Sequence, residues 1–202
     1  MTWLIVGLGN PGPEYAATPH NVGYLAVADI VTRVGGRLSK HKRANALVAE
    51  SRLGAPGSSQ QVILAQSLTY MNDSGGPVSS LMTFYGVEPS TLIVLHDELD
   101  IAFTSIRVKF GGGDNGHNGL KSIRRSIGTG EYFRVRLGIG RPEGRQSPVD
   151  FVLKAFSSAQ REEVAVMIAR GADAAESLVF DGLERTQNVF NADVPTDQKA
   201  SK

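Results

Sequence analysis

The sequence predicts an α/β fold: a single domain built on a twisted, mixed, mostly parallel sheet with helices on both faces. Short apolar runs typical of strands alternate with segments whose apolar residues recur at helical spacing. Two of the runs, 3–6 and 91–95, are continuously apolar or β-branched, which is typical of strands buried on both faces of a parallel sheet. The chain has 202 residues, 41% hydrophobic and 20% charged, which suits one soluble globular domain.

The first strand, at 3–6, leads into a turn that is dense in glycine and proline, at 7–13. Prolines at 11, 13 and 19 restrict the backbone, so this loop is expected to be stiff. An open α/β sheet places its ligand site at the carboxyl ends of its strands. The loop carries Asn10 and His20, and we expect both side chains at such a site.

The same turn fits the glycine fingerprint of dinucleotide-binding proteins, in the letters GLGNPG at 7–12. That fingerprint requires a helix to begin within it, so that pyrophosphate lies at the helix N-terminus. Here Pro11 and Pro13 delay any helix until about His20. The acid near the required spacing, Asp29, lies inside a predicted helix rather than after a second strand. A nicotinamide site is therefore disfavoured.

The remaining pattern supplies the rest of the sheet and its helices. Further strands are predicted at 45–53, 61–64, 91–95, 105–110 and 132–138, with the first two forming a hairpin-like pair. Helices are predicted at 22–34, 77–85, 120–127, 159–180 and 183–190. The polar segment 141–148 is expected to be a loop that can move. One domain covers 1–193, and 194–202 is expected to be a disordered tail.

Composition narrows the function. The chain contains no cysteine, which excludes disulfides, thiolate chemistry and zinc–cysteine sites. Its N-terminus has no basic segment and its apolar run is too short for a signal peptide or membrane span, so we expect a cytoplasmic protein.

Positive charge is concentrated in two segments, although the net charge is only +1. Residues 107–145 hold nine Lys or Arg against three acids, and a second cluster is formed by Arg37, Lys40, Lys42 and Arg43. A basic run is often only a solvated face. In a nearly neutral protein this concentration favours a polyanionic partner.

Polar side chains collect at the expected ends of the strands. A neutral imidazole such as His20 can take a proton from water, and the carboxylate of Asp97, after the strand 91–95, can orient it. Amides at Asn10, Asn72 and Asn118 can donate hydrogen bonds to a carbonyl or an oxyanion. With no G-x-S-x-G motif and no cysteine, direct attack by water is favoured over a covalent acyl-enzyme.

Each of these features also has a structural interpretation. A lone loop histidine is often structural, Tyr70 and Met71 are compatible with a core position, and the acids at 97–100 are compatible with a metal site. Neighbouring acids do not set out ligands as a calcium loop does, so a metal is disfavoured. His117, at a predicted helix start, suits a neutral hydrogen-bonding residue better than a base. The residues alone lead to a hydrolase or an RNA-binding α/β protein.

The chain resembles bacterial peptidyl-tRNA hydrolases. The matching stretches are LIVGLGNPGPEYAATPHNVG (4–23), YMNDSG (70–75), LHDELD (95–100), KFGGGDNGHNGLKSI (109–123), FRVRLGIG (133–140) and DFVL (150–153). Each piece alone is unspecific, but the combination is highly specific. The resemblance implies a monomeric α/β protein that hydrolyses the ester between a peptide and the 3′ ribose of tRNA, with no metal and no cofactor.

The resemblance also implies roles for individual residues. It puts the general base at His20 and its partner at Asp97. The implied substrate-binding set is Asn10, Tyr15, Tyr70, Met71, Asn72, His117 and Asn118. The implied contacts to the tRNA 5′ phosphate are Lys109 and Arg136.

One pair departs from the family pattern: Asp114-Asn115 stands where many members have His-Gly or another small pair. An acid there makes the local electrostatics toward tRNA differ from the family pattern. The family pattern also suggests that the loop at 141–148 acts as a lid. The rival class is a non-catalytic RNA-binding or ribosome-associated domain, which has no need of the His20 and Asp97 pair.

Overall fold

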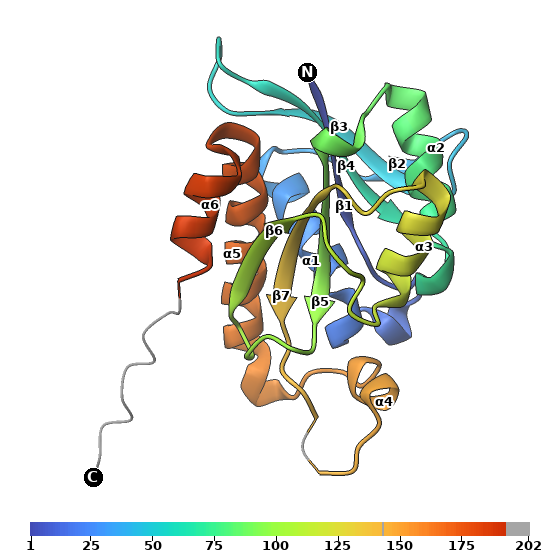
Figure 1. Ribbon diagram of the computed structural model, residues 1–202, viewed down its shortest axis with the longest axis vertical. Coiled ribbons are helices and arrows are strands. Elements are labelled where there is room, and N and C mark those ends of the chain that lie inside the picture. The colour runs from blue at the N-terminus through green and yellow to red at the C-terminus, as the bar shows by residue number, and fades with distance from the viewer. Residues whose placement is uncertain (143, 193–202) are drawn as a thin grey trace.

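The sheet organises the whole molecule (Figure 1), which is a computed structural model that describes residues 1–142 and 144–192. The sheet has seven strands in the order β2-β3-β4-β1-β5-β7-β6. Their bounds are β1 Thr2–Gly7, β2 Ser39–Lys40, β3 Ala46–Leu53, β4 Gln60–Ser67, β5 Leu92–Glu98, β6 Ile106–Phe110 and β7 Phe133–Gly138. The tail expected at 194–202 lies outside the described residues.

Parallel pairing forms the centre of the sheet, and antiparallel pairing forms its two sides. The strand β1 pairs parallel with β4 and β5, and β5 pairs parallel with β7. On the two sides, β3 is antiparallel to β2 and β4, and β6 is antiparallel to β7. The predicted mixed, mostly parallel sheet is thereby confirmed, as is the hairpin-like pair, which is β3 and β4.

Helices cover both faces of the sheet, as predicted. Figure 1 shows α1, α5 and α6 on one face, α2 and α3 on the other, and α4 beyond the carboxyl ends of the central strands. Their bounds are α1 Val22–Arg33, α2 Gly75–Tyr85, α3 Asn118–Ile127, α4 Pro148–Val152, α5 Arg161–Phe180 and α6 Gly182–Phe190. Within the described ranges, no helix combines the length and the apolar character needed to cross a bilayer.

Two hydrophobic cores, one on each face, explain the continuous apolar run in β1. Trp3 and Ile5 belong to the core under α1 and α5, while Leu4 and Val6 belong to the core under α2 and α3. Successive side chains of a strand point to opposite faces, so a strand between two helix layers must be apolar at every position. Truncating such a side chain to alanine costs about 2–5 kcal/mol.

The glycines of the fingerprint-like turn serve close packing between a strand and a helix. A Cβ built on Gly7 would lie 2.1 Å from the carbonyl oxygen of Gly23, and one on Gly23 would lie 2.3 Å from the carbonyl oxygen of Leu95. The two glycines therefore let the start of α1 lie directly against β1 and β5. Because α1 begins only at Val22, no α-helix begins within the turn, where only the one-turn 3-10 helix Pro13–Tyr15 starts, in agreement with the rejection of a nicotinamide site.

The main departure from the predicted elements is the length of β5. The prediction ends this strand at Leu95, but pairing with β7 continues through His96, Asp97 and Glu98, and all three are buried. Polar side chains can extend a buried strand when hydrogen-bond partners surround them. Asp97 thus lies within the strand rather than after it. Two smaller differences are that α2 begins at Gly75 and that the short helix α4 was not predicted.

Candidate active site

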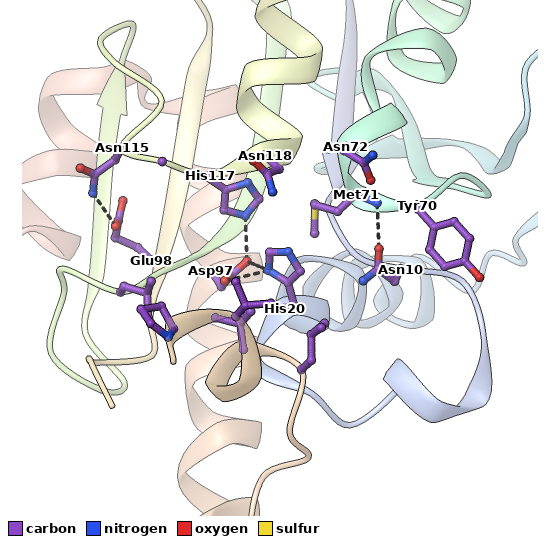
Figure 2. A pocket seen from close by; sticks show the side chains of 16 residues that line it. Asn10, His20, Tyr70, Met71, Asn72, Asp97, Glu98, Asn115, His117 and Asn118 are labelled. Carbon is purple, nitrogen blue, oxygen red and sulfur yellow. Dashed lines mark hydrogen bonds and ion pairs between the residues drawn. The ribbon is translucent and has the colours of Figure 1, made fainter. Parts of the chain in front are cut away.

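A cavity of about 450 Å³ lies at the carboxyl ends of β1 and β5, where the sequence predicts a ligand site. Five segments contribute to its wall: the β1–α1 loop, the turn before α2, the end of β5, the start of α3, and α4 with the residues beside it. Eight of the predicted site residues line it: Asn10, His20, Tyr70, Met71, Asn72, Asp97, His117 and Asn118 (Figure 2).

His20 and Asp97 are in direct contact. The Nδ1 atom of His20 lies 3.0 Å from both carboxylate oxygens of Asp97. A carboxylate only accepts hydrogen bonds, so Nδ1 carries the proton and Nε2 retains its lone pair. The Asp97 residue is 3% exposed and the His20 side chain 14% exposed, so the pair is shielded but reachable. The arrangement suits an imidazole that accepts a proton.

His117 contacts the same carboxylate from the other side. Its Nε2 lies 2.8 Å from Oδ1 of Asp97, and its Nδ1 accepts the backbone N–H of Gly119 at 3.1 Å. Because Nδ1 is an acceptor there, the ring is neutral and donates through Nε2. It caps the start of α3 and orients Asp97, in line with the expectation of a neutral hydrogen-bonding residue.

The electrostatics of Asp97 follow from these contacts. Burial alone would raise the pKa of the Asp97 carboxyl, but the electrostatic attraction of the His117 and His20 rings and the hydrogen bonds that they donate outweigh burial and hold that pKa well below its ordinary value. Burial is the main reason that the pKa of the His96 ring lies well below its ordinary value, and the neighbouring His117 lowers that pKa further. Asp97 is therefore ionised at neutral pH, with the neutral ring of His96 packed behind His117 at 5.0 Å.

Asn10 is fixed so that its amide nitrogen remains a donor. Its Oδ1 accepts the backbone N–H of Met71 at 2.8 Å, while its own backbone is bonded twice to the side chain of Asn21. With the oxygen committed, the NH₂ group is the part of this buried side chain left for a ligand in the cavity. Asn21 was not predicted, and its role is visible only from the folded loop.

The other amides and the aromatic residues form the rim. Asn72 and Asn118 are exposed side chains that line the cavity. Tyr70 is 57% exposed, and its ring packs edge-on against Tyr15 at 6.4 Å. Tyr15 does not line the cavity itself, so it contacts the site through Tyr70.

An apolar wall closes the cavity opposite the amides. It is formed by Pro148, Val149, Val152 and Leu153 on and beside α4. Val149 is 64% and Leu153 37% exposed, so both present apolar surface at the cavity. In the sequence, the only feature that pointed to this wall was the short stretch DFVL at 150–153.

Lys109 and Arg136 lie outside the cavity, on the neighbouring strands β6 and β7. Arg136 donates through Nε and an Nη atom to Glu98, at 3.2 and 3.1 Å, and Glu98 does line the cavity. Burial, followed by the charges of Arg136 and Arg134, lowers the pKa of Lys109. Glu98 was missed in the sequence because it is one of several neighbouring acids.

Hydrogen bonds of Arg134 and Asn115 hold the glycine-rich loop at 111–116 in place. The fully buried guanidinium of Arg134 donates to the carbonyl oxygens of Gly112 and Gly113. Asn115 donates to Glu98 at 2.7 Å and to Asp100 at 2.9 Å. Asp114 lies near Arg134 and Arg124, so the acid that departs from the family pattern is paired within the protein.

One group of potential metal ligands occurs among the described residues. A ring nitrogen each of His20 and His117 and a carboxylate oxygen of Asp97 lie within 4.8 Å of one another. Direct hydrogen bonds account for these distances, since both rings donate to the carboxylate. A metal would have to displace protons that hold the triad together, so this geometry fits a hydrogen-bonded triad better than a metal centre.

Comparison with known proteins identifies the family to which the chain belongs. The sequence profile described as peptidyl-tRNA hydrolase matches residues 4–200. The peptidyl-tRNA hydrolase of Streptomyces coelicolor is 52% identical over 191 residues, which cover 94% of this chain and 95% of that protein. The enzyme of Frankia alni is 53% identical over 190 residues, covering 94% of each chain.

Solved structures agree. The crystal structure of peptidyl-tRNA hydrolase from Acinetobacter baumannii has a TM-score of 0.83 and 34% identity, covering 95% of each chain. The match in sequence and fold extends over nearly the whole chain, which decides against the rival class of a non-catalytic RNA-binding domain. The chain belongs to the peptidyl-tRNA hydrolase family, and it is a hydrolase of peptidyl-tRNA.

Proposed function

We propose that this hydrolase cleaves its substrate by direct attack of water, with His20 as the general base. The observation that carries the proposal is the hydrogen bond from Nδ1 of His20 to Asp97, which leaves the Nε2 lone pair to receive a proton from water. The water oxygen attacks the ester carbonyl carbon as His20 takes the proton. The 3′ oxygen of the ribose then leaves and takes that proton back, which yields a peptide carboxyl group and a free tRNA hydroxyl.

The surroundings of His20 support its role. Its imidazolium forms during the attack, and the ionised Asp97 stabilises that charge at 3.0 Å. His117 holds the carboxylate in place from the other side, at 2.8 Å. His117 is therefore proposed as a positioning residue and not as a second base.

A covalent mechanism has no nucleophile at hand. The described residues that line the cavity include no serine, threonine, cysteine or lysine. The side chains that remain are amides, imidazoles, carboxylates, Tyr70 and apolar groups, and the carboxylate of Asp97 is committed to two imidazoles. Water activated by His20 is the simplest nucleophile that this cavity can supply.

The amides are proposed to bind the ester and the peptide. The NH₂ group of Asn10 is a rigid donor for the carbonyl oxygen as it becomes negative, and Asn72 and Asn118 add donors at the rim. Tyr70, backed by Tyr15, and Met71 are proposed to contact the peptide. Val149 and Leu153 offer it an apolar wall, and the loop at 141–148 next to that wall is proposed as a lid.

Lys109 and Arg136 are proposed to bind the 5′ phosphate of tRNA. Register places Arg107 opposite Arg136 and Lys109 opposite Arg134 on the paired strands β6 and β7. Burial and the charges of Arg136 and Arg134 lower the pKa of Lys109, so a phosphate beside Lys109 would offset this repulsion. Arg136 must exchange or share its contact with Glu98 when the phosphate arrives.

The same proposal includes three further expectations. The reaction needs no metal, because the three candidate ligands already satisfy one another by hydrogen bonding. The working unit is a monomer, as the resemblance to the family implies. The enzyme works in the cytoplasm, where translation produces peptidyl-tRNA.

The test uses the purified full chain and an N-blocked aminoacyl-tRNA in ¹⁸O-labelled water with a chelator present. We expect release of the acyl group with ¹⁸O in its carboxylate and none in the tRNA, at a rate the chelator does not change. Rapid quenching during a single turnover should yield no acylated protein by mass spectrometry. An acylated protein would overturn direct attack by water, and loss of activity with chelator that added metal restores would overturn metal independence.

A further inference from the structure

A second basic surface lies on the far side of the molecule from Lys109 and Arg136. We define the basic–aromatic surface by six residues: Arg37, Lys40, His41, Lys42, Arg43 and Phe84. They line a hollow of about 630 Å³ where β2 and β3 meet the end of α2. All four Lys and Arg side chains are exposed. The one acid among the described lining residues is Glu50, and it accepts a hydrogen bond from Tyr85 at 2.7 Å.

The turn that carries the cations has a fixed shape. The ring nitrogen Nδ1 of His41 accepts the backbone N–H groups of Arg43 at 3.2 Å and Ala44 at 2.9 Å. The backbone N–H of His41 in turn donates to Ala46 at 2.9 Å. Lys42 and Arg43 are therefore presented by an ordered turn, which lowers the entropy that a ligand must overcome.

The aromatic ring of Phe84 packs against this turn. Its ring is 48% exposed, yet it is held edge-on by His41 at 4.7 Å and by Tyr85 at 4.8 Å. The guanidinium of Arg43 lies over the ring, 5.7 Å from its centroid. The surface thus presents a stacked guanidinium and aromatic ring surrounded by three further cations. Serine and threonine hydroxyls of α2, at Ser79, Ser80 and Thr83, continue the hollow beside Phe84 and Arg43.

The surface lies next to the catalytic cavity along the carboxyl edge of the sheet. The backbone N–H of Leu68, just after β4, donates to the carbonyl of Asn45 at 2.8 Å, and Tyr70 and Met71 of the cavity follow directly in the chain. In the strand order, β3 is three spacings from β5 on one side and β7 is one spacing from β5 on the other. At about 4.8 Å per spacing, β3, which borders the surface, and β5, which borders the cavity, are separated by roughly 14 Å across the sheet.

We propose that the basic–aromatic surface is a second RNA-binding site, which holds a nucleotide segment of the tRNA substrate away from both the ester and the 5′ phosphate. The inference rests on the proposed function in that the RNA is taken to be the substrate. Phosphates would contact Lys40, Lys42 and Arg37, and an unpaired base would stack on Arg43 and Phe84.

The chemistry of the surface favours RNA over an acidic protein. Cations alone suit any polyanion, but unpaired bases of RNA stack on aromatic rings and guanidinium planes. Hydroxyls such as those on α2 add hydrogen bonds to phosphate and sugar oxygens. The tRNA bound at the cavity is already an RNA held beside this surface. An acidic protein could pair its carboxylates with the lysines and arginines, but it has no bases to stack on the ring of Phe84 and the guanidinium of Arg43.

The experiment compares two substrates that share the ester but differ in RNA. One is an N-blocked aminoacyl-tRNA, and the other is the same acyl group on adenosine alone. We expect Phe84→Ala to raise KM for the tRNA substrate about fivefold, the lower end of base–aromatic stacking, with kcat unchanged. Lys42→Gln with Arg43→Gln should raise it further and flatten the slope of log K against log salt by about 1.4, for two contacts. Neither change should alter kinetics on the adenosine ester.

Three controls separate the possible causes. Arg43→Lys keeps the charge but loses the planar stack, so it should retain the salt slope and still raise KM. Arg185→Gln removes an exposed arginine from α6, on the opposite face of the sheet, and should change nothing. Equal urea unfolding midpoints for wild type and variants would show that the fold is intact.

The outcomes are distinct. Unchanged KM for the tRNA substrate in both surface variants would overturn the inference, and so would an equal rise of KM for the adenosine ester, because the effect would then lie in the cavity. Affinity for deacylated tRNA, measured by fluorescence anisotropy, tests the surface without turnover. A wild-type protein that binds this tRNA through the surface but releases no acyl group would contradict the proposed function alone.

Discussion

The candidate active-site cavity lies beside the cationic face, which is formed by Arg107, Lys109, Arg134 and Arg136 on β6 and β7. The charges of these two regions are arranged differently. In the cavity, the buried charge of Asp97 is surrounded by two imidazoles that donate to it. On the face, Lys109 lies opposite Arg134 across two strands, and burial together with the charges of Arg136 and Arg134 lowers the pKa of Lys109. The cavity is satisfied without a ligand, which suits a preorganised reaction centre. The face is stabilised by an added anion, which suits binding.

The sharpest way to break this comparison is to remove the proposed base. His20→Ala should lower kcat by about 10²–10⁴, the usual contribution of a general base, with little change in KM, because His20 is not expected to hold tRNA. Single-turnover and steady-state kinetics on N-blocked aminoacyl-tRNA measure both quantities. A variant that retains half of the wild-type kcat would remove His20 from this role.

Asp97→Asn tests the carboxylate that orients the base. We expect kcat to fall about 10–100-fold, the cost known for carboxylates that orient metal-ligating histidines, and so less than for His20→Ala. The double variant His20→Ala, Asp97→Asn should be no slower than His20→Ala alone, because Asp97 acts through His20. Additive losses in the double variant would instead give Asp97 an independent role.

The difference between the two regions also explains what the sequence could predict. His20 and Asp97 could be placed together because His20 lies in the loop after the first strand and Asp97 follows the apolar run 91–95, and parallel strands bring their carboxyl ends to one edge. Asn21 and Glu98 were missed because their partners, Asn10 and Arg136, lie across loops and strands that sequence spacing does not relate. The extension of β5 was missed because its last residues are polar and are buried only by pairing with β7.

The cationic face should respond to a different probe from the cavity. Lys109→Ala should raise KM about tenfold with kcat nearly unchanged, since one charge-assisted contact is worth roughly 1.5 kcal/mol. The slope of log K against log salt should flatten by about 0.7–0.9. Lys109 is a cleaner site for this test than Arg136, whose removal leaves the buried carboxylate of Glu98 without that partner.

Substrate chemistry supplies the matching control for the face. Removing the 5′ phosphate from tRNA should weaken binding to wild type by more than Lys109→Ala does, because Arg136 also loses its contact, and should weaken the Lys109→Ala variant by less than wild type. If dephosphorylation weakens the variant as much as wild type, the phosphate is bound elsewhere, and the helix α3 arginines Arg124 and Arg125 become the next candidates.

The hydrogen-bonded charge of Asp97 should make the free energy of unfolding depend on pH in acid. The pKa of Asp97 is lower in the folded than in the unfolded chain, so its contribution to stability is fully present above the unfolded value of about 3.9 and is lost as pH falls below it. For one proton, the free energy of unfolding should fall by up to about 1.4 kcal/mol per pH unit there. Urea denaturation between pH 5 and pH 2 should show a shallower fall for Asp97→Asn, and identical slopes would contradict the ionised, hydrogen-bonded Asp97 described above.

The smallest expected effect concerns Asn115, which links the cavity to the acids at the end of β5. Its backbone has φ +48°, in the left-handed region, and its side chain donates to Glu98 and Asp100. Asn115→Gly loses both hydrogen bonds but adopts this φ without strain, whereas Asn115→Ala loses them and keeps the strain. We expect the alanine variant to be less stable than the glycine variant by about 1–2 kcal/mol in urea unfolding. Both variants free Glu98 to hold Arg136 more firmly, so both should raise KM for tRNA slightly and equally, with kcat unchanged. Equal stability of the two variants would mean that the strain at this residue is relieved elsewhere in the loop, and a fall in kcat would mean that Asn115 positions the neighbouring His117.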